Sequence, residues 1–234
     1  MIVAFCGKAG AGKSTVAEAV QKKIGYARYS MASPIKQFFY HLFMWDTEHL
    51  YGHLKETDVK TPFVSMNDIL IASRDTRIPI DEYRLLIEWN KVFEQFAVDT
   101  DVFDGYPATQ YVISPRKAMQ LFGTDVCRTI QEDIWIECAR NALKRNSNNL
   151  IIDDARFDNE IAFVLENKGT LVHITGRGGS VGTAHQSEQL NVDKYNMRQF
   201  DNSGSKQKVV AFAEKLCNDL IVMADKDSQA EANL

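Results

Sequence analysis

The stretch GKAGAGKST, residues 7–15, constrains this chain more than any other part of its sequence. It fits the pattern GxxxxGK[ST], and it lies between the apolar run IVAFC and a segment, STVAEAVQKKIG, whose apolar residues have helical spacing. In a strand, loop and helix of this kind, the glycines turn backbone N–H groups toward a phosphate, and the helix start adds its positive dipole end. A tight turn that carries Lys-Ser by chance would not explain the flanking strand and helix. The sequence therefore predicts a site for a nucleoside triphosphate.

The residues of this loop have separate expected roles. Lys13 is expected to reach the β and γ phosphates of ATP, and the Ser14 hydroxyl is expected to ligate Mg²⁺. The expected ATP contacts within the loop are Gly7, Gly10, Ala11, Gly12, Lys13, Ser14 and Thr15.

Strands and helices alternate along the rest of the chain. Strands are expected at residues 26–30, 149–154 and 170–175, and amphipathic helices at 32–43, 114–126, 133–145, 157–169 and 205–221. The segment 190–202 shows no clear strand pattern before the last helix. This alternation predicts an α/β fold with a parallel sheet covered on both faces.

The chain is expected to form a single domain over residues 1–234, with a core of about 1–44 and 112–224. The segment 45–111 is more polar and aromatic, and its strongest helical spacing lies at 80–97, so we expect a helical insertion there. The glycine-rich stretch at about 176–190 lacks apolar periodicity and indicates a mobile loop.

Charge and cysteine content argue against several classes of partner. The formal net charge is -4, from 27 basic and 31 acidic residues, so no overall field attracts a nucleic-acid polymer or an anionic membrane. No apolar run approaches the roughly 20 residues that a membrane span needs. The cysteines have no metal-binding spacing and indicate buried thiols in a reducing compartment, the cytoplasm. They are Cys6, Cys127, Cys138 and Cys217.

The loop alone leaves the phosphate acceptor open, because water and many small molecules can take a terminal phosphate. A GTPase would add base-reading motifs, and no NKxD is present. Motor-type ATPases usually have a longer core and assemble, and nothing here indicates a ring. Small-molecule kinases use basic residues for the acceptor and arginines on a lid, and this chain has candidates for both.

Three further stretches indicate a family. SPRKAMQLFGTDVCR with a later Trp (114–135), LIIDDARFDNE (150–160) and HQSE (185–188) follow the loop in this order. Together they resemble the phage-type deoxynucleoside monophosphate kinases of the P-loop kinase superfamily. The resemblance implies a three-layer α/β/α fold with a parallel five-stranded sheet, a helical acceptor-side insertion and a lid. It also implies phosphorylation of a deoxynucleoside monophosphate by ATP with Mg²⁺, in a host cytoplasm if a phage encodes the chain.

The resemblance also implies the acceptor contacts. Arg116, in the first turn of its helix, would hold the acceptor phosphate with two parallel hydrogen bonds, which lysine cannot do equally well. Trp135 would stack on the base or wall it in, unless it is an ordinary packed aromatic residue. The expected substrate-binding residues are Lys8, Arg116, Gly123, Trp135, Asp154, Arg156 and Glu160.

Two carboxylates end the LIIDD strand, at the edge where parallel sheets bind ligands. Asp154 matches the family motif and is favoured for the Mg²⁺ site, although Asp153 occupies the usual strand-end position of a metal-binding carboxylate. Arg156 is expected to be catalytic, by neutralising charge on the transferring phosphoryl group. Glu160, four residues on, would share its helical face and orient Arg156 or touch the sugar, unless the two form a surface salt bridge.

The glycine-rich loop resembles the lid over ATP in this family. Arg177 is the expected catalytic and ATP-binding lid residue, because a closed lid excludes water and an arginine matches the spread negative charge. His185 would cap or brace the loop, which also carries Glu188. Asn202 lies where the family approaches the adenine of ATP.

Some positions depart from the family pattern or stay open. The family often has a basic residue in the middle of the loop, where this chain has Ala9 and Ala11 and a lysine only at Lys8. Lys55 and Lys60 would belong to an acceptor-side lid or to a solvated charged loop.

Two alternatives to this function remain. A kinase of the same class would phosphorylate dephospho-coenzyme A or a sugar acid. A nucleotide-gated binding protein would show little turnover and would dock a partner on the helix expected at 80–97. The resemblance also implies a homodimer, for which this helix would form the interface or else pack inward.

Overall fold

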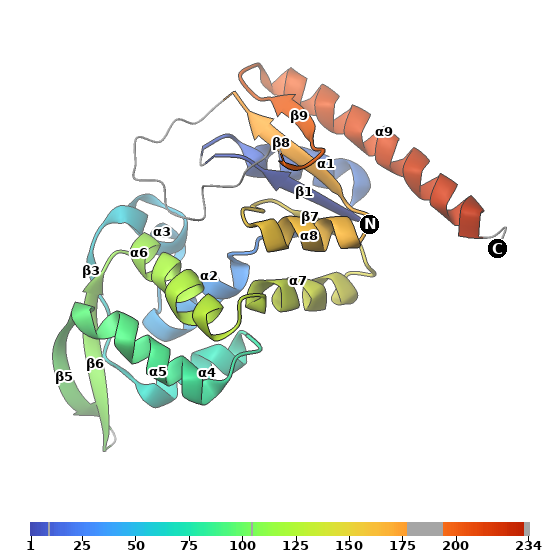
Figure 1. The fold of residues 1–234 in the computed structure, drawn as a ribbon. Coiled ribbons are helices and arrows are strands. Elements are labelled where there is room, and N and C mark those ends of the chain that lie inside the picture. Colours follow the sequence, from blue (N-terminus) through green and yellow to red (C-terminus); the bar gives the residue numbers. More distant parts are fainter. Residues whose placement is uncertain (9, 104, 177–193, 232–234) are drawn as a thin grey trace. The chain divides into compact units, whose positions relative to one another are not determined.

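The computed structural model describes residues 1–8, 10–103, 105–176 and 194–231, with side chains to residue 222. The chain forms two compact units (Figure 1). Unit 1 contains Met1–Met31 and Ala139–Leu234, and unit 2 is the continuous segment Ala32–Cys138. Within the described ranges, none of the helices combines the length and the apolar character that crossing a bilayer requires.

Unit 1 is built on a five-stranded parallel sheet, which confirms the predicted sheet. Its strands lie in the order β2 (Ala27–Tyr29), β7 (Leu150–Ile152), β1 (Ile2–Cys6), β8 (Thr170–Thr175) and β9 (Arg198–Asp201). The central strand β1 is buried along its whole length, as expected for a strand with neighbours on both sides and helices on both faces.

Helices cover both faces of this sheet. α1 (Lys13–Ile24) and α9 (Lys206–Glu231) pack against one face, where Val3 and Phe5 of β1 share a hydrophobic cluster with Val16 and Leu216. α8 (Asp158–Glu166) contacts β1 and β8 and lies on the opposite face (Figure 1). The three layers therefore match the expected α/β/α architecture.

The fifth strand lies where no strand pattern was evident. β9 pairs with β8 in parallel, with Val172 opposite Arg198 and Thr175 opposite Asp201. Its sequence, RQFD, has no β-branched residue, and β9 pairs only at the edge of the sheet. Backbone pairing with β8 forms this strand, and residue composition does not reveal it.

Unit 2 combines helices with a small antiparallel sheet. Its helices are α2 (Ser33–Phe43), α3 (Thr47–Leu50), α4 (Met66–Asp75), α5 (Glu82–Phe93) and α6 (Pro115–Gln120), with the 3-10 helices η1 (His53–Glu56) and η2 (Glu94–Phe96) and the π-helix η3 (Leu121–Arg128). Its strands are β3 (Val59–Lys60), β4 (Val64–Ser65), β5 (Ala97–Phe103) and β6 (Tyr106–Ile113). α7 (Ile134–Arg145) begins in unit 2 and ends in unit 1.

We expected a helical insertion over residues 45–111, but this region also contains a hairpin formed by β5 and β6. Phe103 pairs with Tyr106, so only the two residues of the sequence Asp-Gly connect the strands. Gly105 has φ +82°, a conformation that glycine adopts without strain. An Asp-Gly pair between strand-like segments is the usual sequence signal for such a turn.

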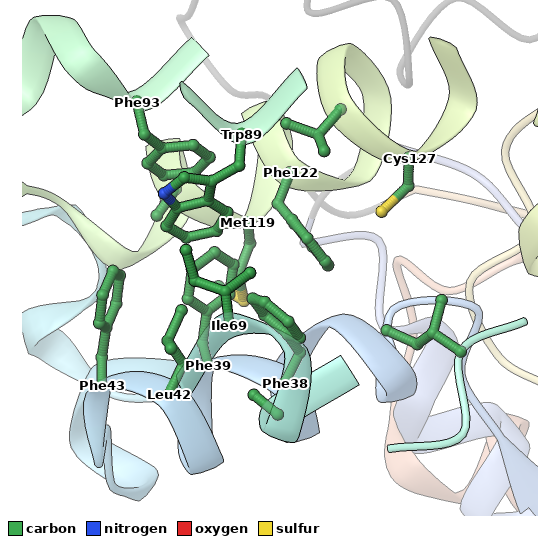
Figure 2. Close-up of a cluster of buried hydrophobic side chains, with 14 of the residues drawn as sticks. Phe38, Phe39, Leu42, Phe43, Ile69, Trp89, Phe93, Met119, Phe122 and Cys127 are labelled. Carbon is green, nitrogen blue, oxygen red and sulfur yellow. The ribbon is translucent and has the colours of Figure 1, made fainter. Parts of the chain in front are cut away.

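The core of unit 2 is rich in aromatic residues (Figure 2). Trp89 of α5 stacks on Phe93 at a centroid distance of 3.9 Å, and Phe38 stacks on Phe122 at 4.1 Å. Leu85, Trp89 and Phe93 have no exposed surface. The apolar face of α5 therefore packs inward and is not available as a docking surface.

Candidate phosphate-binding site

The glycine loop follows the carboxyl end of β1 and needs its glycines for two reasons. Gly7, Gly10 and Gly12 have φ angles of +137°, +76° and +86°, which side chains disfavour. In addition, a Cβ atom at Gly7 would lie 2.3 Å from the Ile174 carbonyl oxygen, and one at Gly12 would lie 2.2 Å from Nδ2 of Asn202. At Gly7 and Gly12 the backbone therefore lies so close to its neighbours that a residue with a side chain would clash with them.

Carbonyl groups of the loop are occupied by donors of the protein itself. The Lys13 ammonium donates to the carbonyl oxygens of Gly7 at 2.8 Å and of Lys8 at 2.9 Å. The Gly12 carbonyl accepts from the N–H groups of Thr15 and Val16. With these carbonyls engaged, the loop can present N–H groups to an anion.

The start of α1 adds donors to the same place. The first N–H groups of a helix have no partner within the helix. Gly12 is the N-cap residue of α1, and no side chain caps this helix. Ser14 and Thr15 are exposed in the first turn, so a bound phosphate would complete this helix end.

Charged side chains converge on Lys13, which is only 8 % exposed. Burial lowers the pKa of the Lys13 ammonium below its ordinary value, and the positive charge of Arg156 lowers that pKa further. Asp154, Cys6 and Asp153 act in the opposite direction on the same pKa. Two of the predicted site residues and the alternative carboxylate Asp153 are therefore close enough to Lys13 to influence its charge.

The two carboxylates after β7 have different partners. Asp153 accepts a hydrogen bond at 2.5 Å from the guanidinium of Arg28 on β2. Asp154 accepts from the Ser30 hydroxyl at 2.5 Å and from the Met31 backbone N–H at 2.6 Å. Sequence analysis missed Arg28 and Ser30, since both pairs join residues more than a hundred positions apart.

Glu160 is related to Arg156 differently from what we expected. Arg156 precedes α8, which begins at Asp158, so the two residues do not share a helical face. Glu160 is 2 % exposed and accepts hydrogen bonds from the backbone N–H groups of Arg156, at 2.7 Å, and of Phe157, at 3.3 Å. Its carboxylate therefore caps the start of α8 and holds the backbone that carries the Arg156 side chain.

Three of the predicted acceptor residues belong to unit 2. Arg116, in the first turn of α6, forms an ion pair with Glu56 of η1. Trp135 is 3 % exposed, and its indole N–H donates to the Gly123 carbonyl at 3.0 Å within the aromatic core. This packing favours a structural role for Trp135, because little of its ring is exposed to stack on a base.

The other predicted positions are distributed as follows. Lys8 and Lys60 are exposed and Lys55 is half-buried. Ala9, Arg177, His185 and Glu188 lie outside the described residues, as does the expected lid from residue 177 onward. Asn202 is buried at the end of β9 and contacts the loop: its side-chain amide donates to the Ala11 carbonyl at 2.8 Å.

The four cysteines are free and buried, as expected. Burial raises the pKa of the Cys6 thiol to about 11. At pH 8 the thiolate fraction of Cys6 should then be about a hundred-fold below that of an ordinary cysteine. We therefore expect Cys6 to react slowly with iodoacetamide in the folded protein and rapidly in denaturant, as peptide mass spectrometry over time would measure. Rapid labelling of the folded protein at Cys6 would contradict this prediction.

Comparison with known proteins shows a family and a relative that resemble this chain. The family model described as deoxynucleotide monophosphate kinase matches residues 1–197. A protein of Acanthamoeba polyphaga mimivirus named "Putative deoxynucleotide monophosphate kinase" is 22% identical over 242 residues, which cover 98% of this chain and 98% of that protein. The first match covers the glycine loop and both carboxylates after β7.

Proposed function

Because this chain belongs to the deoxynucleotide monophosphate kinase family, we propose that it transfers the γ-phosphate of ATP to deoxynucleoside 5'-monophosphates, forming the diphosphates and ADP. Such a reaction would supply nucleotides for DNA synthesis. We place it in the cytoplasm, since four free buried cysteines fit a reducing compartment.

The arrangement around Lys13 is the observation that carries this proposal. A glycine loop, an uncapped helix start, a buried ammonium group and the charge of Arg156 all lie at the carboxyl end of β1. Phosphoryl transfer develops negative charge on the transferring group, and catalysis depends mainly on positioning and on matching that charge. Lys13 and Arg156 supply positive charge, and no strong base is needed, because a monophosphate oxygen is already a nucleophile.

The residues present also fit a magnesium ion that arrives with the nucleotide. Among the residues that the structure describes, no group of three or more His, Cys, Asp or Glu side chains could hold a metal by itself. Mg²⁺ usually retains several waters and binds through one or two protein groups and the substrate phosphates. Ser14 and Asp154 would hold it here, and when bound it would neutralise phosphate charge.

On the acceptor side, we propose that Arg116 binds the phosphate of the monophosphate through its planar guanidinium. Its ion pair with Glu56 fits this assignment, because a carboxylate and a phosphate offer similar acceptor oxygens. Lys8 and Gly123 are proposed as further acceptor contacts, and Arg177 as the lid residue that stabilises the transferring group.

The alternative functions require different structural features. A nucleotide-gated binding protein would need an exposed docking helix, but the aromatic face of α5 is buried within unit 2. A kinase for another small acceptor differs only in the molecule phosphorylated, and base choice depends on a few pocket contacts.

A coupled assay of ADP release tests the proposal. ATP and Mg²⁺ would be supplied with dAMP, dCMP, dGMP or dTMP in turn, with water alone, and with dephospho-coenzyme A. We expect release that depends on at least one deoxynucleoside monophosphate, and the pattern would give the base range. Release in water alone would indicate an ATPase, and release only with dephospho-coenzyme A would replace the proposed acceptor.

A further inference from the structure

Asn202 connects the glycine loop to β9, the edge strand of the sheet. Its side chain is 3 % exposed, and Nδ2 donates to the Ala11 carbonyl oxygen at 2.8 Å. Its backbone N–H donates to the carbonyl of Thr175, the last residue of β8, at 2.9 Å. This bond fixes the position of Asn202 directly after β9. The amide is therefore held by the sheet and holds the loop in turn.

This contact determines the direction of one peptide unit. The described part of the chain has no cis peptide bond, and in a planar trans peptide the C=O and the following N–H point in opposite directions. Because the Ala11 carbonyl points to Asn202, the N–H of Gly12 must point away from Asn202. That N–H lies at the N-cap of α1, where a phosphate is expected to bind.

The Gly7 carbonyl accepts from the Lys13 ammonium at 2.8 Å, and this donor would turn to the phosphates when a nucleotide binds. The Lys8 carbonyl accepts from Lys13 and also from the Ala11 N–H at 3.2 Å. The Asn202 amide carries no charge to offer a phosphate, so its bond to Ala11 can persist in both states. Gly12 leaves the space for it, since a Cβ there would lie 2.2 Å from Nδ2.

We propose that Asn202 is a positioning residue that fixes the Ala11–Gly12 peptide so that the Gly12 N–H faces the nucleotide phosphates. This role differs from the adenine contact that the family resemblance implied. It rests on the proposed function only in taking the glycine loop as the phosphate site.

The test compares two variants with similar changes. Asn202→Asp keeps the size of the side chain but replaces the donor by a carboxylate oxygen. Asn167→Asp makes the same change at an amide that donates to the Phe163 carbonyl at 2.8 Å, at the end of α8. The dissociation constant for Mg²⁺–ADP would be measured by calorimetry, with the melting temperature of each variant.

We expect Asn202→Asp to weaken ADP binding by about ten-fold or more, since a buried carbonyl loses its donor and the peptide is released. The Michaelis constant for ATP should rise similarly, while that for the deoxynucleoside monophosphate should change less than about two-fold. Asn167→Asp should leave both constants unchanged. A purely structural role would lower the melting temperature without changing the affinity of the folded protein for ADP.

Asn202→Ala separates the lost donor from the added charge and serves if the aspartate variant does not fold. It should also weaken ADP binding, by a smaller factor. Unchanged ADP affinity in a folded Asn202 variant, or an equal loss in Asn167→Asp, would overturn the proposal. ADP binding is measured without any acceptor, so the result stands even if no deoxynucleoside monophosphate is phosphorylated.

Discussion

Replacing Lys13 by methionine is expected to lower kcat by on the order of a thousand-fold, with the fold retained. Methionine fills the space of the buried lysine stem and removes the ammonium, so the loss reports charge at the phosphates. Steady-state ADP release with a saturating deoxynucleoside monophosphate would measure the change. Part of the effect should also appear in ATP affinity, because Lys13 is expected to contact the phosphates before transfer.

Lys22→Ala provides the matched control on the same helix. Lys22 pairs with Glu18 on the surface of α1, and its side chain is 72% exposed. Removing an exposed i, i+4 pair costs only a few tenths of a kcal/mol, so this variant should keep normal kcat. Near-normal turnover in Lys13→Met would refute the assignment of the loop as the catalytic phosphate site.

The second large effect concerns stability and lies in unit 2. Trp89→Ala should lower the free energy of unfolding by about 3–5 kcal/mol, because it removes a fully buried indole and leaves a cavity. The indole also stacks on Phe93 and donates to the Tyr111 hydroxyl at 3.2 Å. Urea unfolding followed by circular dichroism would measure the difference.

Two further variants serve as controls for Trp89→Ala. Tyr83→Ala removes an aromatic side chain from the same helix, but Tyr83 is 76% exposed, so we expect a change within about 0.5 kcal/mol. Trp89→Phe retains a ring and should lie between Trp89→Ala and the unchanged protein. Equal effects of Tyr83→Ala and Trp89→Ala would show that burial of α5 does not stabilise unit 2.

Local patterns of the sequence were sufficient for the glycine loop between β1 and α1 and for most of the sheet. The loop is defined by residues a few positions apart, so the spacing of Gly7, Gly12 and Lys13 carries the whole signal. β1 and β7 are buried apolar runs, and β8 buries the apolar residues Leu171, Val172 and Ile174, so composition detects all three strands. The β5–β6 hairpin was detectable from its Asp-Gly pair, but the polar residues around it concealed the strands.

Contacts between distant residues could not be predicted in this way. The Arg28–Asp153 pair spans 125 positions and the Asn202–Ala11 contact spans 191, and no periodicity within one element relates such residues. Glu160 shows a different limit. Its role depends on whether α8 begins before or after Arg156, and helix boundaries are the least certain part of a sequence-based prediction.

The discontinuity of unit 1 affects how the chain can fold during its synthesis. β1 is made first, yet its neighbours β7 and β8 begin only at Leu150 and Thr170. At about 5–20 residues per second, a ribosome needs on the order of ten seconds to reach them. Throughout that interval the apolar segment IVAFC has no sheet to join, whereas unit 2, one continuous segment, is complete once Cys138 has been made, before β7 and β8. A newly made chain is therefore expected to expose this apolar segment to aggregation and to chaperones until β7 and β8 have been made.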